Sequence, residues 1–383
     1  MAKDKDKKVG RLNSFYQSLK KDDRTVVKDL QEEKKKKIDF INTGSWVLNT
    51  LIGDGSRTFS PGGYPRGHMV EVFGDESCGK TTLAIQACVQ VQKAGGIPMW
   101  LDYERTFQTD YAEALGLNCN KDNFIFLEPE TLEQGFTIME QAIEDKTCRP
   151  ALIVIDSVAA MTPAEYLKNK MDEMGRIGLQ ASVISRKIPT FAKKIPASNS
   201  CILFLNQLRS MIKGQYDVGP KEETPGGRAL KYYSSVRISL QKREIEKVEK
   251  ICRITGKKGK EPVNVKVNAT IVKNKIDKPY YTAPIYIRFG EGIDNEISIV
   301  ELACNTGVIK KSGARYNFDV GDKAVFEVFG REGLRSHLVN NPTDYKLLRD
   351  VISTKFKEGQ IKEDQQAIEN DKEGVQMIGT DAE

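Results

Sequence analysis

A glycine-rich run in the first third of the chain carries the strongest chemical signal. It reads Gly74-Asp75-Glu76-Ser77-Cys78-Gly79-Lys80-Thr81 and has the spacing of a phosphate-binding loop. In such a loop the backbone N–H groups cradle phosphates, the lysine adds a positive charge and the threonine hydroxyl ligates Mg²⁺. This run and Thr82 are therefore the predicted ATP-binding residues, and Lys80 is also a candidate catalytic residue.

Two carboxylates follow apolar segments of the sequence. Asp156 closes the apolar run 151–155, from which an acidic side chain can reach a magnesium ion, so Thr81 and Asp156 are the predicted metal ligands. Glu104 lies just past the strand expected at 99–101, where it could orient or deprotonate a water. From spacing alone, Asp156 as a helix cap and Glu104 as a surface carboxylate stay open.

Alternating strands and helices over residues 41–294 would position these groups. Continuous apolar runs at 151–155 and 201–205 are typical of parallel strands buried on both faces. Further strands are expected at 69–73, 99–101 and 123–127, with helices over 81–93 and from Thr131, where Gln134 completes a capping box. The pattern predicts an α/β fold, a P-loop ATPase core with a mostly parallel central sheet. Strands at 232–240, 263–272 and 283–289 are expected to extend that sheet.

The two ends of the chain differ from the middle. Residues 1–40 are predicted to form a small helical arm for polymerisation and carry 13 Lys+Arg against 8 Asp+Glu. Residues 295–356 are predicted to form a small α/β C-terminal module, and 357–383 an acidic, disordered tail. Solubilising termini remain an alternative reading of these charges.

Composition narrows the class of protein. With 39% hydrophobic and 29% charged residues, and without 18 consecutive apolar residues, the sequence predicts no membrane span. The charged start, Met1 to Lys8, does not resemble a signal peptide. The seven cysteines form no CxxC pair, which favours reduced thiols without zinc. A cytoplasmic protein is therefore expected.

A long stretch without periodicity, residues 208–228, suits single-stranded DNA. Such DNA is bound by cationic groups and by side chains that stack on or insert between bases, and paired glycines permit close approach of the backbone. A plain surface loop is the alternative. The candidates for DNA contact are Arg209, Ile212, Lys213, Tyr216, Gly226, Gly227 and Arg228.

Several motifs, taken in order, resemble those of bacterial RecA recombinases over residues 40 to about 350. They are Asn42–Ser45, Gly74–Thr82, Asp102–Glu104, Ile155–Ala160, Leu205–Arg209, Pro225–Tyr233, Val272–Lys275 and Gly290–Ile293. The resemblance implies a RecA-like core and an ATP-dependent enzyme of DNA recombination and repair, with ATP and Mg²⁺ as cofactors. Such a protein forms helical filaments on single-stranded DNA and catalyses strand exchange. The expected location is the cytoplasm of a bacterial or phage-infected cell.

The resemblance also implies roles for individual residues. Glu104 would activate the attacking water, and Gln207 would contact the γ-phosphate and signal to the DNA-binding stretch. Lys273 and Lys275 would reach the ATP of a neighbouring subunit and, with Lys80, complete the predicted catalytic set. Tyr111 would stack on adenine.

A first DNA-binding loop is implied at 169–179. Its candidate contacts are Ile177, Gly178, Ser185 and Arg186, whereas two positions that are commonly basic in the family are Ser182 and Pro189 here. Lys242 and Arg243 match a second site for homologous duplex DNA. The implied partners are both DNAs and further copies of the chain, and the resemblance also allows single-strand-binding and loading proteins.

Two other functions are weighed against recombination. A ring-forming DNA helicase of the same ATPase superfamily shares the phosphate loop and Glu104, but normally carries a larger N-terminal domain than residues 1–40. A non-catalytic DNA scaffold would lack the complete catalytic set, which consists of Lys80, Thr81, Glu104 and Asp156.

Overall fold

The protein is described from a computed structural model. The described residues are 14–18, 38–53, 62–168, 178–210, 222–251, 256, 258–321 and 323–355. By its internal contacts the chain divides into two units, Met1–Asp39 and Phe40–Glu383. In the first unit, residues 14–18 are helical. The second unit contains the elements described below.

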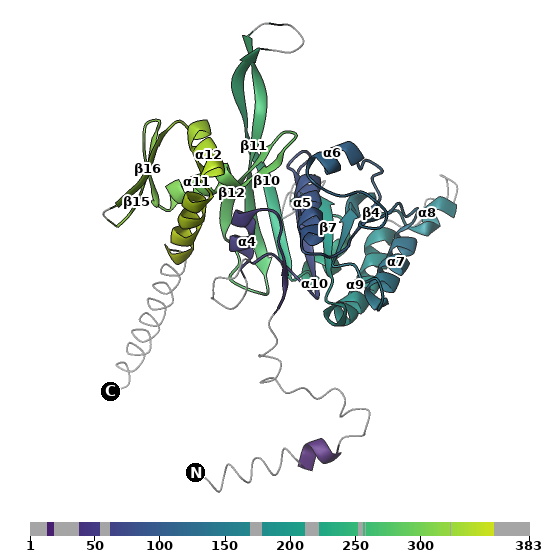
Figure 1. Cartoon of the computed structure of the whole chain (residues 1–383). Helices are drawn as coiled ribbons and strands as arrows, with labels where there is room; N and C mark the ends of the chain where they lie inside the picture. The colour runs from purple at the N-terminus through teal and green to yellow at the C-terminus, as the bar shows by residue number, and fades with distance from the viewer. Residues whose placement is uncertain are drawn as a thin grey trace, which may run out of the picture. The chain divides into compact units, whose positions relative to one another are not determined.

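A nine-stranded sheet forms the centre of this unit, in the order β13-β12-β11-β10-β3-β7-β6-β4-β5 (Figure 1). The strands from β10 to β5 pair in parallel, and those from β10 to β13 pair antiparallel. The predicted α/β fold with a mostly parallel sheet is therefore confirmed. The strand bounds are β3 (His68–Gly74), β4 (Pro98–Asp102), β5 (Ile125–Leu127), β6 (Leu152–Asp156), β7 (Cys201–Gln207), β10 (Val236–Ile251), β11 (Lys258–Asn274), β12 (Thr282–Arg288) and β13 (Gly292–Asp294).

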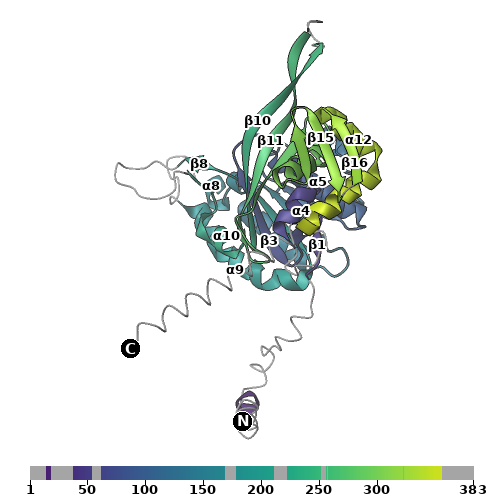
Figure 2. The ribbon, with the colours of Figure 1, turned by 90° about the vertical axis from the view of Figure 1, so that its left-hand side faces the viewer.

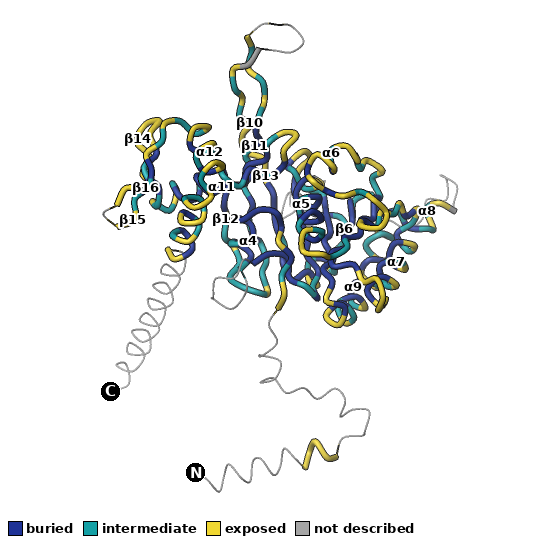
Figure 3. The backbone as a smooth tube through the Cα atoms, in the orientation of Figure 1, coloured by how far each residue is buried: buried dark blue, intermediate teal, exposed yellow. Residues whose placement is uncertain are grey.

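Helices cover both faces of the sheet, which explains the continuous apolar runs. In β6, Val154 joins the core cluster that contains helix α5 (Lys80–Lys93), while the next residue, Ile155, joins the cluster under α7 (Leu132–Glu144) and α9 (Leu179–Ser198). Figure 3 shows this buried interior. Each aliphatic side chain buried in this way contributes about 1.5–3 kcal/mol.

The start of α7 follows its predicted signal. The Thr131 hydroxyl accepts from the Gln134 backbone N–H at 3.1 Å, and the Gln134 side chain accepts from the Glu130 N–H at 2.8 Å. The side chain thus reaches one residue before the position that a standard capping box uses.

The strand expected at 232–240 begins later than the sequence indicated. Tyr232 and Tyr233 end a short helix, α10 (Gly227–Tyr233), and β10 starts at Val236. The helix forms because Gly226 adopts a left-handed φ of 94° at its start and Leu230 is buried against the core. The aromatic pair is therefore exposed on a helix, not paired in the sheet.

Strands β10 and β11 extend beyond the sheet as a two-stranded ribbon (Figure 2). Pairing continues to Ile251 opposite Lys258, with register shifts near Lys242 and Glu246. At the base of the ribbon, Arg331 forms an ion pair with Glu246 and donates to Glu301 at 3.2 Å. This contact ties the ribbon to the C-terminal part of the chain.

A three-stranded sheet and helices follow residue 294. Phe318 is fully buried, and its ring centre lies 5.3 Å from that of Phe326 in a tilted contact. Leu334 and Leu338 of the next helix are also buried. In the ranges that the structure describes, no helix is both long and apolar enough to cross a bilayer. The elements are α11 (Asn295–Asn305), β14 (Ile309–Ser312), β15 (Arg315–Val320), β16 (Lys323–Phe329), α12 (Arg331–Asn340) and a helical stretch over 342–355.

Candidate functional site

The phosphate loop joins the end of β3 to the start of α5. Gly79 precedes the first helical residue with a φ of 85°, and a Cβ atom there would lie 2.1 Å from Cδ1 of Ile287. The left-handed backbone favours glycine here, and a larger residue would also have to displace the end of the Ile287 side chain. Residues 75–77 are exposed, so the loop opens to solvent above the N-terminus of α5.

Lys80 folds back over the loop. Its ammonium donates to the backbone carbonyls of Gly74 at 3.0 Å and Asp75 at 2.6 Å. Cys78 lies beneath it, with the sulfur 3.8 Å from the ammonium, and burial raises the pKa of this thiol. Because the thiol stays neutral, it does not offset the positive charge that Lys80 brings to the loop.

Thr81 and Asp156, the two predicted metal ligands, lie together. The Thr81 hydroxyl donates to Asp156 Oδ2 at 3.1 Å. Burial, followed by the charge of Glu104, raises the pKa of Asp156 to about 7. Within the described residues no three His, Cys, Asp or Glu side chains are grouped to hold a metal. The pair suits Mg²⁺, which usually takes one or two protein ligands and completes its shell with phosphates and water.

Glu104 is fixed by three neighbours. The fully buried Asp102 carboxylate accepts from the backbone N–H of Glu104 at 3.1 Å, which shapes the turn after β4. The Glu104 carboxylate accepts from the Ser157 hydroxyl and from Gln207 Nε2, the latter at 3.0 Å. No role for Asp102 or Ser157 is predicted from the sequence, although both lie in motifs that resemble those of the recombinases.

One pocket of about 440 Å³ is lined by the phosphate loop together with Glu104, Asp156 and Gln207. Tyr111 stands in its wall, with its hydroxyl 2.9 Å from that of Thr82. Three apolar residues that the sequence analysis missed, Val265, Ile287 and Phe289, form another part of the wall. The predicted residues that line the pocket are Glu76, Ser77, Cys78, Gly79, Lys80, Thr81, Thr82, Glu104, Tyr111, Asp156 and Gln207.

Lys273 and Lys275 do not line this pocket. The Lys273 ammonium donates to the carbonyls of Lys231 at 2.8 Å and Tyr232 at 2.7 Å, at the C-terminal end of α10. Burial, and then the charges of Lys275 and Arg237, lower the pKa of Lys273 to about 8. Lys275 is exposed. Neither lysine is therefore positioned at the nucleotide pocket of its own chain.

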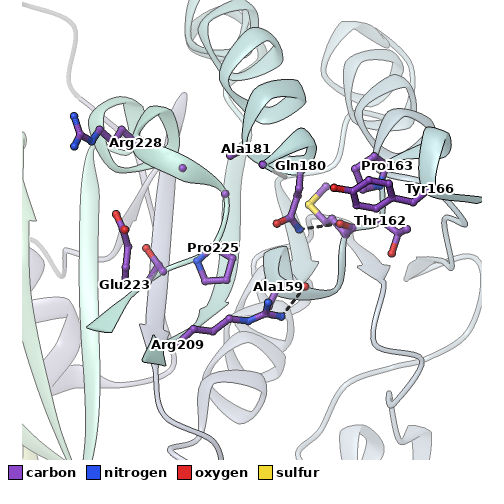
Figure 4. A pocket seen from close by; sticks show the side chains of 15 residues that line it. Ala159, Thr162, Pro163, Tyr166, Gln180, Ala181, Arg209, Glu223, Pro225 and Arg228 are labelled. Atoms are coloured by element: carbon purple, nitrogen blue, oxygen red, sulfur yellow. Dashed lines mark hydrogen bonds between the residues drawn. The ribbon is translucent and has the colours of Figure 1, made fainter. Parts of the chain in front are cut away.

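A second pocket, of about 620 Å³, gathers part of the predicted DNA-binding set (Figure 4). Arg209 extends across it and donates to the carbonyl of Ala159 at 3.4 Å, and Arg228 lies on α10 at its edge. Glu223 is paired with Lys231 at 2.5 Å. The predicted residues that line this pocket are Gly178, Arg209, Gly226, Gly227 and Arg228.

Local structure explains how the pocket is held. Strands β8 (Arg209–Ser210) and β9 (Glu222–Glu223) pair antiparallel and bring the two ends of 211–221 together. A Cβ atom on Gly226 would lie 3.0 Å from Val158, and one on Gly227 would lie 3.0 Å from Ala181. The glycine pair thus packs α10 against its surroundings, which is a structural requirement in addition to the predicted DNA contact.

Two further predicted DNA contacts are described and lie outside this pocket. Ser185 and Arg186 are exposed on α9 and do not line the pocket. The others, Ile177, Ile212, Lys213 and Tyr216, lie outside the described residues.

A phosphate loop on a mostly parallel, doubly covered sheet defines an α/β nucleotide-binding protein of the P-loop class. Comparison with known proteins narrows the class. The RecA N-terminal domain model matches residues 13–294. The protein named Protein RecA of Borrelia hermsii is 38% identical over 84% of this chain and 82% of its own. Protein RecA of Lactobacillus johnsonii is 32% identical over 97% of both chains.

The chain therefore belongs to the RecA family. Protein RecA of Staphylococcus carnosus is also similar, at 35% identity over 83% of this chain and 81% of its own. The crystal structure of the RadB recombinase matches at a TM-score of 0.48 and 20% identity, covering 66% of this chain and 98% of that one. That last likeness is too weak to support any conclusion.

Proposed function

We propose that the protein is an ATP-dependent recombinase that assembles on single-stranded DNA and pairs it with a homologous duplex. Membership of the RecA family makes it a DNA-dependent ATPase and favours recombination over the helicase alternative. One observation carries the proposal for this site. Gln207, which holds Glu104 in the nucleotide pocket, lies two residues before Arg209 of the second pocket.

The hydrolytic role follows from the contacts of Glu104. The loop N–H groups and Lys80 hold the triphosphate at the start of α5. Thr81 and Asp156 would hold Mg²⁺, whose charge would stabilise the transferring phosphoryl group. Glu104 accepts a proton from the attacking water, and the bonds from Ser157 and Gln207 fix its carboxylate in place.

The DNA-binding role uses the second pocket. Arg209 and Arg228 supply positive charge next to the backbone of Gly226 and Gly227, a combination suited to a phosphate chain. Base pairing, not protein contact, would then select the homologous duplex. Lys242 and Arg243, both exposed on the ribbon, would contact that duplex.

Filament formation would complete the active site. Lys273 and Lys275 would act on the ATP of the next subunit, as cations supplied across an interface do in other phosphoryl-transfer enzymes. Single-strand-binding and loading proteins would be further partners. The acidic segment 357–383, outside the described residues, would compete with DNA for basic surface.

Lys273→Ala tests this proposal. ATP hydrolysis is measured with and without single-stranded DNA, and filaments are followed by electron microscopy. Wild type should hydrolyse ATP faster with DNA, on filaments, and the variant should lose about 10³-fold in rate, the loss typical of a missing trans-acting cation. Lys260→Ala, an exposed lysine on the same strand, should behave as wild type. Hydrolysis indifferent to DNA, or closed rings, would contradict the recombinase.

A further inference from the structure

Three polar side chains pack together in the interior on adjacent central strands. Glu71 lies in the middle of β3, and its side chain is completely buried. Its carboxylate accepts from Arg237 Nε at 2.6 Å and from Asn206 Nδ2 at 2.9 Å. An unpaired buried carboxylate is costly, so these bonds fix the three side chains relative to one another. We call this group the buried cluster.

Asn206 connects the buried cluster to both pockets. Its Nδ2 group also donates to the carbonyl of Pro225 at 2.9 Å, and its Oδ1 accepts from the backbone N–H of Gln207 at 3.0 Å. Pro225 lines the second pocket and Gln207 lines the nucleotide pocket. One fully buried amide is therefore hydrogen-bonded to a residue of each pocket and fixes the two residues relative to each other.

Arg237 holds the other side of the buried cluster. Its guanidinium stacks on the ring of Phe73 at 4.6 Å, and Phe73 directly precedes the phosphate loop. Arg237 also pairs with Lys273 in the register of β10 and β11. Because it is clamped between the Glu71 carboxylate and an aromatic ring, its charge has few alternative positions. The buried cluster is thus a rigid network of hydrogen bonds that contacts residues of both pockets.

We propose that Asn206, Glu71 and Arg237 are positioning residues that couple DNA binding to the nucleotide pocket. The inference rests on the proposed function, since it takes the second pocket as the DNA site and Gln207 as the nucleotide contact. When Gln207 moves toward a bound nucleotide, Asn206 carries the displacement to Pro225 and so to Gly226 and Gly227. A well-packed, fully bonded interior transmits such a shift instead of absorbing it.

Asn206→Ala is the most direct test, because it removes the link and leaves the ion pair of Glu71 and Arg237 in place. The affinity for fluorescein-labelled oligo-dT is measured by anisotropy with and without a slowly hydrolysed ATP analogue. In wild type the analogue should tighten DNA binding. In the variant this enhancement should fall about tenfold, within the usual range of coupling between sites. The affinity for the analogue, measured without DNA, should change little.

Asn264→Ala is the matched control. Asn264 is equally buried and donates to a glutamate, Glu246, at 3.0 Å, but lines neither pocket. The control should keep the wild-type enhancement. A folded Asn206→Ala variant that keeps it too would overturn the proposal, as would an equal loss in the control.

A second pair of variants decides the matter if Asn206→Ala does not fold. Arg237→Gln should also lose the enhancement, whereas Arg335→Gln, whose Nε donates to the buried Asp294 carboxylate at 2.8 Å, should not. Equal effects of the two would overturn the proposal. Wild type that binds DNA without regard to nucleotide would instead contradict the proposed function itself.

Discussion

Glu104 accepts hydrogen bonds from side chains that two different strands deliver. Ser157 follows β6 and Gln207 ends β7, so the position of this carboxylate depends on the register of two strands as well as on its own turn. A general base must be held within hydrogen-bond reach of its proton, and the contacts of Glu104 provide that restraint.

Replacing Glu104 by Gln should separate nucleotide binding from hydrolysis. The amide keeps the shape of the side chain but accepts a proton poorly, so turnover should fall by about 10²- to 10⁴-fold. The affinity for a fluorescent ATP analogue should change by less than about twofold, since the proposed phosphate contacts are the loop and Lys80. Steady-state hydrolysis and equilibrium titration measure the two effects.

Glu128→Gln is the control for this change. Glu128 follows the neighbouring strand β5 and forms an exposed ion pair with Arg105 at 4.0 Å, a kind of pair that contributes little. Its variant should hydrolyse ATP normally. If Glu104→Gln kept more than a third of wild-type turnover, the role of Glu104 as base would be wrong.

Residue types at strand ends predicted Glu104 and Asp156, because carboxyl ends of parallel strands gather ligands at one edge of a sheet. Ser157 and Asp102 were not predictable in the same way. A serine after a strand has many uses, and only the folded turn brings its hydroxyl to Glu104. Phe289 likewise joined the nucleotide pocket through the pairing of β11 and β12, which a local pattern does not specify.

Among the elements, those with continuous apolar sequences were the most predictable. The strands β6 and β7 are buried on both faces, and a short continuous apolar run predicts such a strand or a segment of buried helix. Helix α10 was missed because Tyr232 and Tyr233 favour a strand by propensity, while the glycine pair and the burial of Leu230 set the local structure instead. The length of the ribbon also exceeded the segments expected at 232–240 and 263–272.

The ribbon of β10 and β11 suggests a test of duplex capture. Lys242→Ala with Arg243→Ala removes two exposed cations from it. Binding of labelled duplex to filaments formed on oligo-dT should weaken, and the slope of log affinity against log salt should fall by about 1 for each lost phosphate contact. Affinity for single-stranded DNA should stay within about twofold, because the proposed site for that strand is the second pocket, away from these two residues.

Lys121→Ala with Lys146→Ala makes the corresponding control. Both lysines are exposed and lie far along the chain from the ribbon. Because each double variant removes two cations, both change the net charge by the same amount. Equal weakening by the two double variants would mean that net charge, and not the ribbon, governs duplex capture.

Considered as a whole, the molecule has a nucleotide pocket whose predicted cations Lys273 and Lys275 lie elsewhere on its surface. The sequence resemblance predicts a role for the lysines across an interface. The structure of one chain adds the contacts that Lys273 makes within that chain. It donates to two carbonyls at the C-terminal end of α10, the helix whose first turn lines the second pocket. The hydrogen bonds of Lys273 within its own chain thus connect a predicted assembly contact to the predicted DNA site.

The lowered pKa of Lys273, together with its proposed role across the interface, predicts that assembly depends on pH. In the single chain this pKa is about 8, below the ordinary value for a lysine, because burial and neighbouring cations disfavour the ammonium. A triphosphate on the next subunit favours the ammonium and raises its pKa again. Assembly therefore takes up a proton once the pH exceeds about 8, so raising the pH above that value weakens assembly, by at most about tenfold per pH unit for each interface.

Light scattering of the protein with an ATP analogue and oligo-dT, between pH 7 and 9.5, measures this dependence. The concentration for half-maximal assembly should be nearly constant below pH 8 and rise above it in wild type. Lys273→Arg should flatten the rise, because a guanidinium stays charged throughout that range. The Lys260→Arg variant should keep the wild-type profile, since that lysine is exposed on the ribbon. A rise of the same steepness in Lys273→Arg would assign the proton to another group and remove Lys273 from the assembly contact.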